Sequence, residues 1–279
     1  MSLGAAEVSA CRALLLDVDG CLVLSDRPGG EGGQALPGAA GLLDLLRETG
    51  RRYVLFTNAS SLPPSDLASS LRALGLAVDG AQVVTPPVVA ADYLAERHAS
   101  RPVLAFGGPG VVEPLRARGV ELLALEEHER AAAVLVGGDP EFGHRKLEAA
   151  ARAVTRGAEL LVTSNSRWFA GRGGRQVGVA AAIAAGITYV TGVEAQVVGK
   201  PSPLALREVL RRLDVEAREL LVVGDDPDLE IRMGKGAGCP TVLVLTGMAD
   251  GHVTDHLPPE LRPDLVLDGI WDLPALLAL

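Results

Sequence analysis

Aromatic residues and cysteines are scarce in this chain of 279 residues: 48% of the residues are hydrophobic, but only 3% are aromatic. The core must therefore be built mainly from Leu, Val and Ala. The length suits one large α/β domain or two moderate ones. The three cysteines, Cys11, Cys21 and Cys239, are an odd number and have no CxxC spacing. This argues against a disulfide framework or a structural zinc site and predicts a cytoplasmic protein.

Basic charge and long apolar runs are scarce as well. The formal net charge at pH 7 is −9. Nucleic acid is therefore not expected as the main partner, because binding to a phosphate backbone requires a basic face. No apolar stretch approaches the roughly 20 residues that cross a bilayer, so no membrane partner is expected either.

Short apolar runs alternate with longer segments of helical periodicity, which is the pattern of βαβ units with a mostly parallel sheet and predicts an α/β fold. The stretches "GAAGLLDLLRETG" and "SDLASSLRALG" predict helices that end at Gly50 and Gly75, where a glycine commonly follows a helix. Strands are predicted at residues 13–16, 53–56, 103–106, 134–136, 160–162, 220–223 and 241–245.

Loop-like segments suggest that the chain leaves one domain and later returns to it. Paired prolines interrupt "VVTPPVVAADYL" (83–94), and a glycine and two prolines mark "VVGKPSP" (197–203). The most loop-like interior stretch is "SNSRWFAGRGGRQVG" (164–178). We predict that an inserted α/β domain at 86–194 interrupts a first domain made of residues 1–85 and 195–279.

Polar residues follow several of the predicted strands. The first strand leads into "DVDG", the second into "TNAS" and a later one into "GDDPDLEI", while the loop "GKPSP" carries a lysine. In an open parallel sheet such positions share the carboxyl edge, where ligands bind. Alternation along an extended segment aims Asp17 and Asp19 to the same side. The residues that this argument collects are Asp17, Asp19, Thr57, Asn58, Lys200, Asp225, Asp226, Asp228 and Glu230.

These residue types meet the needs of phosphoryl transfer, which requires a nucleophile, a cation, donors to the phosphoryl oxygens and an acid for the leaving group. A carboxylate can be the nucleophile and form an aspartyl-phosphate. Several carboxylates without a nearby histidine or cysteine favour Mg²⁺ over zinc. Structural explanations exist for single residues: Thr57 and Asn58 can cap a turn, Lys200 can be solvated, and Glu230 can lie at a helix terminus. The combination of the segments favours a shared site.

The segments resemble the four motifs of the haloacid-dehalogenase (HAD) superfamily of phosphohydrolases, and their order is most similar to its NagD-like, p-nitrophenyl-phosphatase-type subfamily. The resemblance covers most of the chain. It implies a Rossmann-like core with a large α/β cap inserted between the second and third motifs, the interval that contains residues 86–194. The matching stretches are "DVDGCL", "PGAAGLLDLLRETGRRYVLFTNASS", "VLVGGDPEFGHRKLEAA", "GKPSP" and "VVGDDPDLEIRMGKGAGCPTVLVLTGM".

The resemblance implies a role for each matching residue. Asp17 is expected to be the nucleophile and Asp19 the general acid and base, while Thr57 and Lys200 hold phosphoryl oxygens and Asn58 shapes the loop. Asp225 is expected to bind Mg²⁺ together with the Asp17 carboxylate and the Asp19 backbone carbonyl. Relatives that dehalogenate lack a carboxylate at the position of Asp19, so phosphate esters are the expected substrates.

Two departures from the family pattern bear on activity and substrate choice. Glu230 stands where relatives usually carry Asp, and its reach toward Lys200 or a metal-bound water is left open. The relatives' "TNPD" becomes "SNSR" (164–167), with Arg167 two residues after Asn165 in place of an acid. Asp226, Glu230, Asn165 and Arg167 are therefore assigned to a supporting or substrate-contacting role.

The function expected from these residues is a Mg²⁺-dependent phosphatase that acts on a small phosphorylated metabolite through an aspartyl-phosphate. Two alternatives stay open at this point. One is a phosphotransferase or mutase on the same site, and the other is a regulatory protein that binds a phosphorylated ligand with little turnover. Relatives often pair through their caps, so a homodimer through the cap is also expected.

Overall fold

The computed structural model describes residues 8–25, 29–30, 32–99, 101–171, 174–248 and 257–277, with side chains omitted at 168–171 and 174–176. Contacts divide the chain into two compact units. The first comprises Met1–Thr57, Pro64–Val84 and Lys200–Leu279, and the second comprises Asn58–Pro63 and Thr85–Gly199. Both units combine helices with a parallel sheet, which confirms the predicted α/β class. The domain boundaries near residues 86 and 194 stay a prediction.

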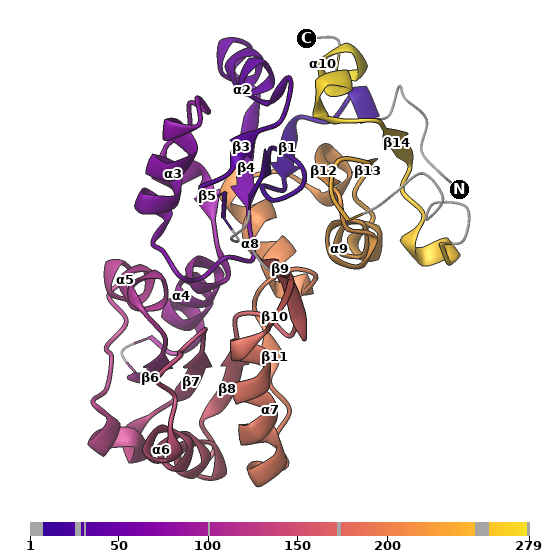
Figure 1. The fold of residues 1–279 in the computed structure, drawn as a ribbon. Helices are drawn as coiled ribbons and strands as arrows, with labels where there is room; N and C mark the ends of the chain where they lie inside the picture. The colour runs from indigo at the N-terminus through magenta and orange to yellow at the C-terminus, as the bar shows by residue number, and fades with distance from the viewer. Residues whose placement is uncertain are drawn as a thin grey trace. The chain divides into compact units, whose positions relative to one another are not determined.

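The first unit is built on a six-stranded sheet with the strand order β14-β13-β12-β1-β4-β5, in which all neighbours are parallel (Figure 1). Strands β4 and β5 lie on one side of β1. Strands β12, β13 and β14, which come later in the chain, lie on its other side. A topological switch point therefore lies between β1 and β12. The strands are β1 (Ala13–Leu16), β4 (Arg52–Phe56), β5 (Val83–Val84), β12 (Leu220–Gly224), β13 (Thr241–Val244) and β14 (Leu265–Leu267).

The position of β1 at the centre of the sheet explains why its sequence is apolar at every residue and does not alternate with polar residues. All four residues of "ALLL" are fully buried. A central strand of a parallel sheet is covered on both faces, so every side chain must be apolar. Leu14 pairs with Leu221 of β12 and with Tyr53 of β4, which fixes the register of the three strands.

The helices of the first unit begin and end at ordinary signals. The predicted helices are confirmed as α2 and α3, and the glycines that follow them, Gly50 and Gly75, have φ of 66° and 85°. Helix α8 starts with Pro203 after Ser202, whose Oγ accepts from the Ala205 N–H at 3.1 Å. The elements are α2 (Ala39–Glu48), α3 (Pro64–Ala73), α8 (Pro203–Leu213), α9 (Arg232–Ala237), α10 (Leu273–Leu276) and the antiparallel pair β2 (Val23–Leu24) and β3 (Gln34–Ala35).

The second unit contains a four-stranded parallel sheet with the order β11-β8-β7-β6. Its core is mainly aliphatic and includes Val134, Leu160 and Ile187, with Phe106 as a buried aromatic residue. Nowhere in the described part of the chain does a helix combine the length and apolar character that crossing a bilayer requires. The elements are α4 (Pro86–Arg97), β6 (Val103–Phe106), α5 (Pro109–Ala117), β7 (Ala133–Val136), α6 (His144–Thr155), β8 (Glu159–Val162), α7 (Val179–Thr191) and β11 (Gln196–Val197).

One expectation about the second unit is wrong. The stretch 164–178 was expected to be a loop, but it contains the antiparallel strands β9 (Trp168–Gly171) and β10 (Gly174–Val177). Glycine and arginine made the stretch look irregular. The β-forming residues Trp168, Phe169 and Val177 and the short connection between the strands favour a hairpin instead.

Candidate functional site

Two buried carboxylates lie at the switch point of the first sheet. Asp17 directly follows β1, and its backbone N–H donates to Val223 of β12 at 2.9 Å. Asp225 directly follows β12. Both aspartates are buried. The adjacency of β1 and β12 thus brings together two carboxylates that are more than two hundred residues apart in the chain.

Lys200 provides a buried ammonium beside Asp17. Its side chain is 2% exposed, and Nζ contacts Asp17 Oδ1, Glu230 Oε1 at 2.6 Å and the carbonyl oxygen of Phe56 at 2.8 Å. Burial alone would lower the pKa of Lys200, but the carboxylates of Asp17 and Glu230 outweigh it and raise the pKa. Lys200 is therefore a permanent positive charge beside Asp17.

Asp225 occupies a space that only glycines leave open. Its Oδ2 accepts from the Met248 N–H at 2.7 Å. A Cβ at Gly20 or Gly247 would lie 2.3 Å or 1.9 Å from the same oxygen. Burial and the charges of Asp17 and Glu230 raise the pKa of Asp225 to about 9. The carboxylate is thus held in a tight pocket in which negative charge is in excess.

A divalent cation would relieve this excess. Asp17, Asp225 and Glu230 each offer a carboxylate oxygen, and these oxygens lie within 4.8 Å of one another. Lys200 balances only one of the three charges. Oxygen donors without sulfur or imidazole suit a hard cation such as Mg²⁺. The residues present therefore fit the expected metal.

Glu230 reaches Lys200 despite standing where an aspartate was expected. It belongs to a short π-helical turn, Pro227–Ile231, and is 0% exposed. Its Oε2 also accepts from the Asp226 N–H at 3.3 Å. A Cβ at Gly224 would lie 2.3 Å from Glu230 Cγ, so a glycine makes room for the longer side chain. Burial, with the opposing effect of Lys200, raises the pKa of Glu230 to about 7.

The Asp19 carboxylate is surrounded by hydrogen-bond donors. Thr57 Oγ1 donates to Asp19 Oδ2 at 3.0 Å, and Ser25 Oγ donates to Oδ1 at 3.0 Å. The N–H groups of Gly29 and Gly30 donate as well, at 2.8 to 3.1 Å. Burial and the charge of Asp17 nevertheless raise the pKa of Asp19, against the effect of these donors. A raised pKa favours a carboxyl group that can hold a proton.

The structure brings together the side chains of six predicted residues, and the side chains of the others make different contacts. Asp226 accepts from the Asp228 N–H at 2.8 Å and so caps the turn that carries Glu230. Asn58 lies in the second unit, where a Cβ at Gly199 would be 2.7 Å from its Oδ1. Asn165 and Arg167 are exposed residues of the second unit. The six that meet in the first unit are Asp17, Asp19, Thr57, Lys200, Asp225 and Glu230.

Several residues of the site were not predicted. Ser25, Gly29 and Gly30 bond to Asp19, and Met248 bonds to Asp225 through its backbone. The glycine pair that follows "DVDGCLVLSDRP" was the available signal, but backbone donors leave no side-chain pattern. Cys21 is a free, fully buried thiol, and burial and the neighbouring carboxylates raise its pKa. It is therefore not a thiolate nucleophile.

Comparison with protein families gives two matches. The family described as "Haloacid dehalogenase-like hydrolase" matches residues 14–121, and the family described as "HAD-hydrolase-like" matches residues 197–273. The first match includes Asp17, Asp19 and Thr57, and the second includes Lys200 and Asp225.

Individual proteins are similar over most of the chain. An acid sugar phosphatase of Staphylococcus saprophyticus is 29% identical over 237 residues, which are 85% of this chain and 87% of that protein. The structure of a 4-nitrophenylphosphatase from Thermotoga maritima has a TM-score of 0.85 at 26% identity and covers 97% of this chain and 99% of its own. The structure of a glycerol phosphate phosphatase from Mycobacterium tuberculosis, in complex with magnesium, has a TM-score of 0.82 at 28% identity. The match covers 94% of this chain and 76% of that protein.

Proposed function

Because this chain belongs to the haloacid dehalogenase-like hydrolases, and is a phosphoric monoester hydrolase with their Rossmann-like core and α/β cap, we propose that it is a Mg²⁺-dependent phosphatase for a small phosphorylated metabolite. One observation carries the proposal. Asp17, Lys200 and Asp225 meet at the switch point of the first sheet, with Asp19 two residues after the nucleophile. The cytoplasmic location stays a prediction.

In the first half-reaction, the Asp17 carboxylate oxygen attacks phosphorus in line. The bond between phosphorus and the ester oxygen breaks, and Asp19 gives its proton to that departing oxygen. The raised pKa of Asp19 supports this role, because a carboxyl group with an ordinary pKa holds little proton near neutral pH. The products of this step are an aspartyl-phosphate on Asp17 and the free alcohol.

In the second half-reaction, Asp19 takes a proton from water, whose oxygen attacks phosphorus. The bond between phosphorus and Asp17 breaks, which releases phosphate and restores the Asp17 carboxylate. Asp19 ends the cycle protonated, as it began. One residue thus serves both steps, and no other base has to enter the site.

Lys200 and Thr57 are proposed to hold the phosphoryl oxygens. The Lys200 ammonium beside Asp17 reduces the repulsion between an anionic nucleophile and an anionic phosphoryl group. Its contacts with Glu230 and the Phe56 carbonyl fix its position from two further sides. Thr57 is buried and lies between β4 and the Asp19 carboxylate, so its hydroxyl is also preorganised.

Asp17, Asp225 and the Asp19 backbone carbonyl would hold the Mg²⁺ ion, with Glu230 beside them. When bound, the ion supplies positive charge that offsets the three carboxylates and the phosphoryl oxygens. We further propose that Asn58 shapes the loop after β4 and that Asn165 and Arg167 contact the non-phosphate part of the substrate. Arg167 in place of an acid would favour an anionic substrate group.

The decisive experiment measures phosphate release from a panel of metabolite phosphates with Mg²⁺ and after chelation. Asp17→Asn should lower kcat/KM by about a thousandfold or more, about 4 kcal/mol in the barrier. Asp214→Asn is a matched control, because the Asp214 side chain is almost fully exposed. Undiminished turnover in Asp17→Asn would refute the covalent mechanism. A phosphorylated acceptor in place of free phosphate would identify a phosphotransferase.

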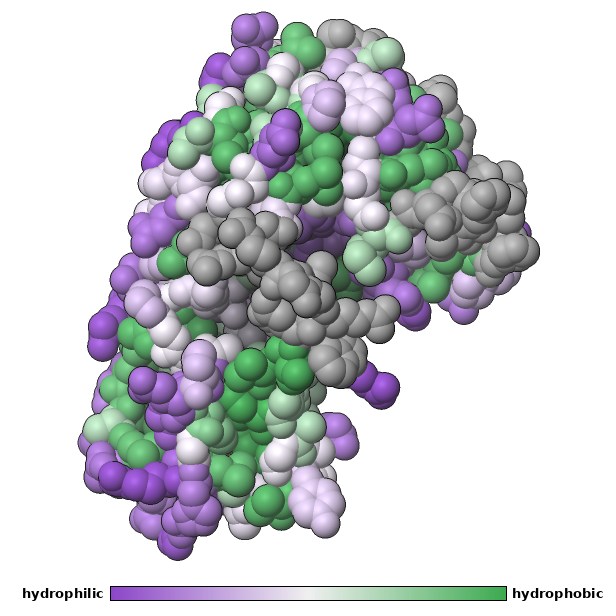
Figure 2. All heavy atoms as spheres, in the orientation of Figure 1, coloured by the Kyte–Doolittle hydropathy of each residue, from purple (hydrophilic) through white to green (hydrophobic). Residues whose placement is uncertain are grey.

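We also propose that the second unit forms a homodimer. On α7, Tyr189 is 92% exposed and Val190 is 60% exposed. Figure 2 shows hydrophobic surface over the region of this helix. Burying such side chains against a second copy would remove them from water.

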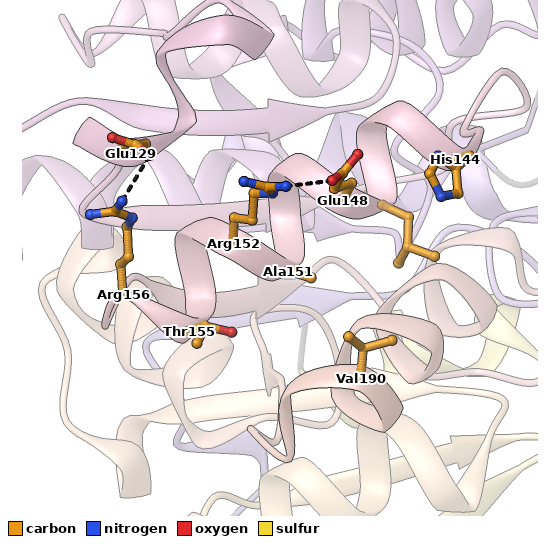
Figure 3. Close-up of a pocket in the computed structure, with 9 residues that line it drawn as sticks. Glu129, His144, Glu148, Ala151, Arg152, Thr155, Arg156 and Val190 are labelled. Carbon is orange, nitrogen blue, oxygen red and sulfur yellow. Dashed lines mark hydrogen bonds and ion pairs between the residues drawn. The ribbon is translucent and has the colours of Figure 1, made fainter.

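A hollow of about 510 Å³ lies beside Val190 and extends along α6 (Figure 3). Its charged residues are paired, Arg152 with Glu148 and Arg156 with Glu129, so they present little net charge. In the proposed dimer, a two-fold axis relates the copies, and Tyr189 of each copy packs against the hollow of the other. Light scattering should give a dimer for the wild type and a monomer for Tyr189→Glu. A monomeric wild type would contradict this proposal.

A further inference from the structure

The Asp19 carboxyl group is held by a loop that lies outside the recognised motifs. The Gly29 N–H donates to both carboxylate oxygens, at 2.8 Å to Oδ2 and 3.0 Å to Oδ1. The Gly30 N–H donates to Oδ1 at 3.1 Å, and Ser25 Oγ donates to Oδ1 at 3.0 Å. Three donors therefore converge on one oxygen, and two of them are backbone groups of adjacent residues.

The backbone at this loop requires glycine. Gly29 has φ of 90° and Gly30 has φ of 81°, values that residues with a Cβ rarely adopt. Both glycines are buried. Successive backbone N–H groups that point to one anion form a small concave binding site of the kind known as a nest. The occupant of this nest is a side chain of the same chain, Asp19.

The distribution of donors distinguishes the two oxygens of Asp19. Oδ1 receives three donors, which is more than its two lone pairs can accept without sharing. Oδ2 receives the Gly29 N–H and the Thr57 hydroxyl. The hydroxyls of Ser25 and Thr57 can both rotate to accept instead, so the backbone donors decide: two N–H groups reach Oδ1 and one reaches Oδ2. A proton on the carboxyl group therefore belongs on Oδ2, the oxygen on the side of Thr57.

We propose that the Gly29–Gly30 turn, together with Ser25, is a positioning element that fixes the Asp19 carboxyl group so that Oδ2 presents its proton to the leaving-group oxygen. The inference rests on the proposed function, since it assigns a role within that reaction. Gly29, Gly30 and Ser25 do not touch the substrate in this proposal. They act through the orientation of Asp19.

The test compares two aryl phosphates in a phosphate-release assay with Mg²⁺. Nitrophenolate leaves readily without a proton, whereas phenolate depends on an acid. The ratio of kcat/KM for p-nitrophenyl phosphate to that for phenyl phosphate therefore reports proton donation in the first half-reaction. Ser25→Ala and Gly30→Ala should raise this ratio by about threefold and about tenfold, and Asp19→Asn should raise it most.

Gly32→Ala is the matched control for strain in the loop. Gly32 also has a positive φ, 68°, but it is exposed and a Cβ there would meet no atom within 4 Å. Its ratio should stay at the wild-type value. Because Ser25→Ala does not change the backbone, it keeps the test decisive even if Gly30→Ala fails to fold.

The outcomes separate the two proposals. Suppose that Asp19→Asn raises the ratio but that Ser25→Ala and Gly30→Ala lower kcat/KM equally for both substrates. The positioning role is then wrong, and the proposed phosphatase activity stands. If Asp19→Asn does not raise the ratio, or if the wild type releases no phosphate from any ester, the proposed mechanism and this inference fail together. In the double variant Asp19→Asn/Gly30→Ala, a further rise in the ratio would also overturn the positioning role.

Discussion

The two units of this chain contain similar parallel sheets but differ in how the chain winds through them. In the first unit the order β14-β13-β12-β1-β4-β5 reverses direction at β1. In the second unit, β6, β7, β8 and β11 follow one another without reversal. Only in the first arrangement do the connections that follow two neighbouring strands, β1 and β12, run in opposite directions from the carboxyl edge of the sheet. Ligands bind in the crevice that such connections leave between them. Winding order, more than sheet type, explains why the reactive groups gather in the first unit.

Charge balance distinguishes the two sheet edges as well. In the second unit the buried Asp139, after β7, is paired with Lys146 at 2.7 Å. In the first unit three carboxylates lie together, Lys200 contacts two of them, and the pKa of Asp225 rises to about 9. A buried acid with its own partner is stable without an ion. An excess of acids is the feature that indicates a cation site.

Among the changes that compare the two units, the largest effect on activity is expected from removing the carboxylate of Asp225. Asp225→Asn should lower kcat/KM by about a hundredfold or more, about 3 kcal/mol, because it removes a proposed metal ligand. Asp139→Asn is the matched change in the second unit and should lower the melting temperature while kcat/KM stays within about twofold. Enzyme kinetics over a range of Mg²⁺ concentrations and thermal unfolding measure both. If Asp225→Asn and Asp139→Asn lost activity equally, the proposed difference between the two sheet edges would be wrong.

A smaller effect is expected when Glu230 is shortened. Glu230→Asp introduces the residue that the family resemblance led us to expect, but the shorter side chain should lose its 2.6 Å contact with Lys200. We expect kcat/KM to fall about tenfold, with little change in KM, because Lys200 is then less well positioned. Gly224 would face an empty space, so the melting temperature should fall slightly. An activity equal to or above that of the wild type would contradict a role for the longer side chain.

The smallest effect concerns a carboxylate of the second unit and depends on pH. Burial alone would raise the pKa of Glu159, but hydrogen bonds from Tyr93 at 2.5 Å and His98 at 2.9 Å lower it. Because the folded pKa lies below the unfolded one, these bonds stabilise the fold above the unfolded pKa and lose that effect as the pH falls through the folded pKa. Glu159→Gln should cost under about 1 kcal/mol at pH 7.

Denaturant unfolding between pH 7 and pH 3 measures this difference in the free energy of unfolding. The gap between wild type and Glu159→Gln should shrink as the pH falls. If this difference in the free energy of unfolding increased as the pH fell, the lowered pKa of Glu159 would not be its cause. Phosphate release should be the same for both proteins, which sharpens the contrast with Glu230.

Much of the fold follows from the sequence because the buried strands are continuous apolar runs. All seven predicted strands exist, including the fully buried β1. Short or half-exposed strands escaped prediction: β5 and β11 have two residues each, and β14 exposes Val266. The hairpin of β9 and β10 escaped because its glycines and arginines are also typical of loops.

The site was predictable where it depends on side chains and unpredictable where it depends on the backbone. Asp17, Lys200 and Asp225 follow from strand ends and motifs, and the structure places them together. Their chemical roles stay predictions until activity is measured. The donors from Gly29 and Gly30 have no side-chain signature, so only the folded chain reveals them.

The two glycines that flank Asp225 have a consequence for mutational scanning. Any side chain at position 20 or 247 would displace the carboxylate that those positions enclose. In a saturation mutagenesis library selected for turnover, both positions should therefore tolerate substitution as poorly as position 225. A reader of such a map would count them as catalytic, although their contribution is the absence of a side chain.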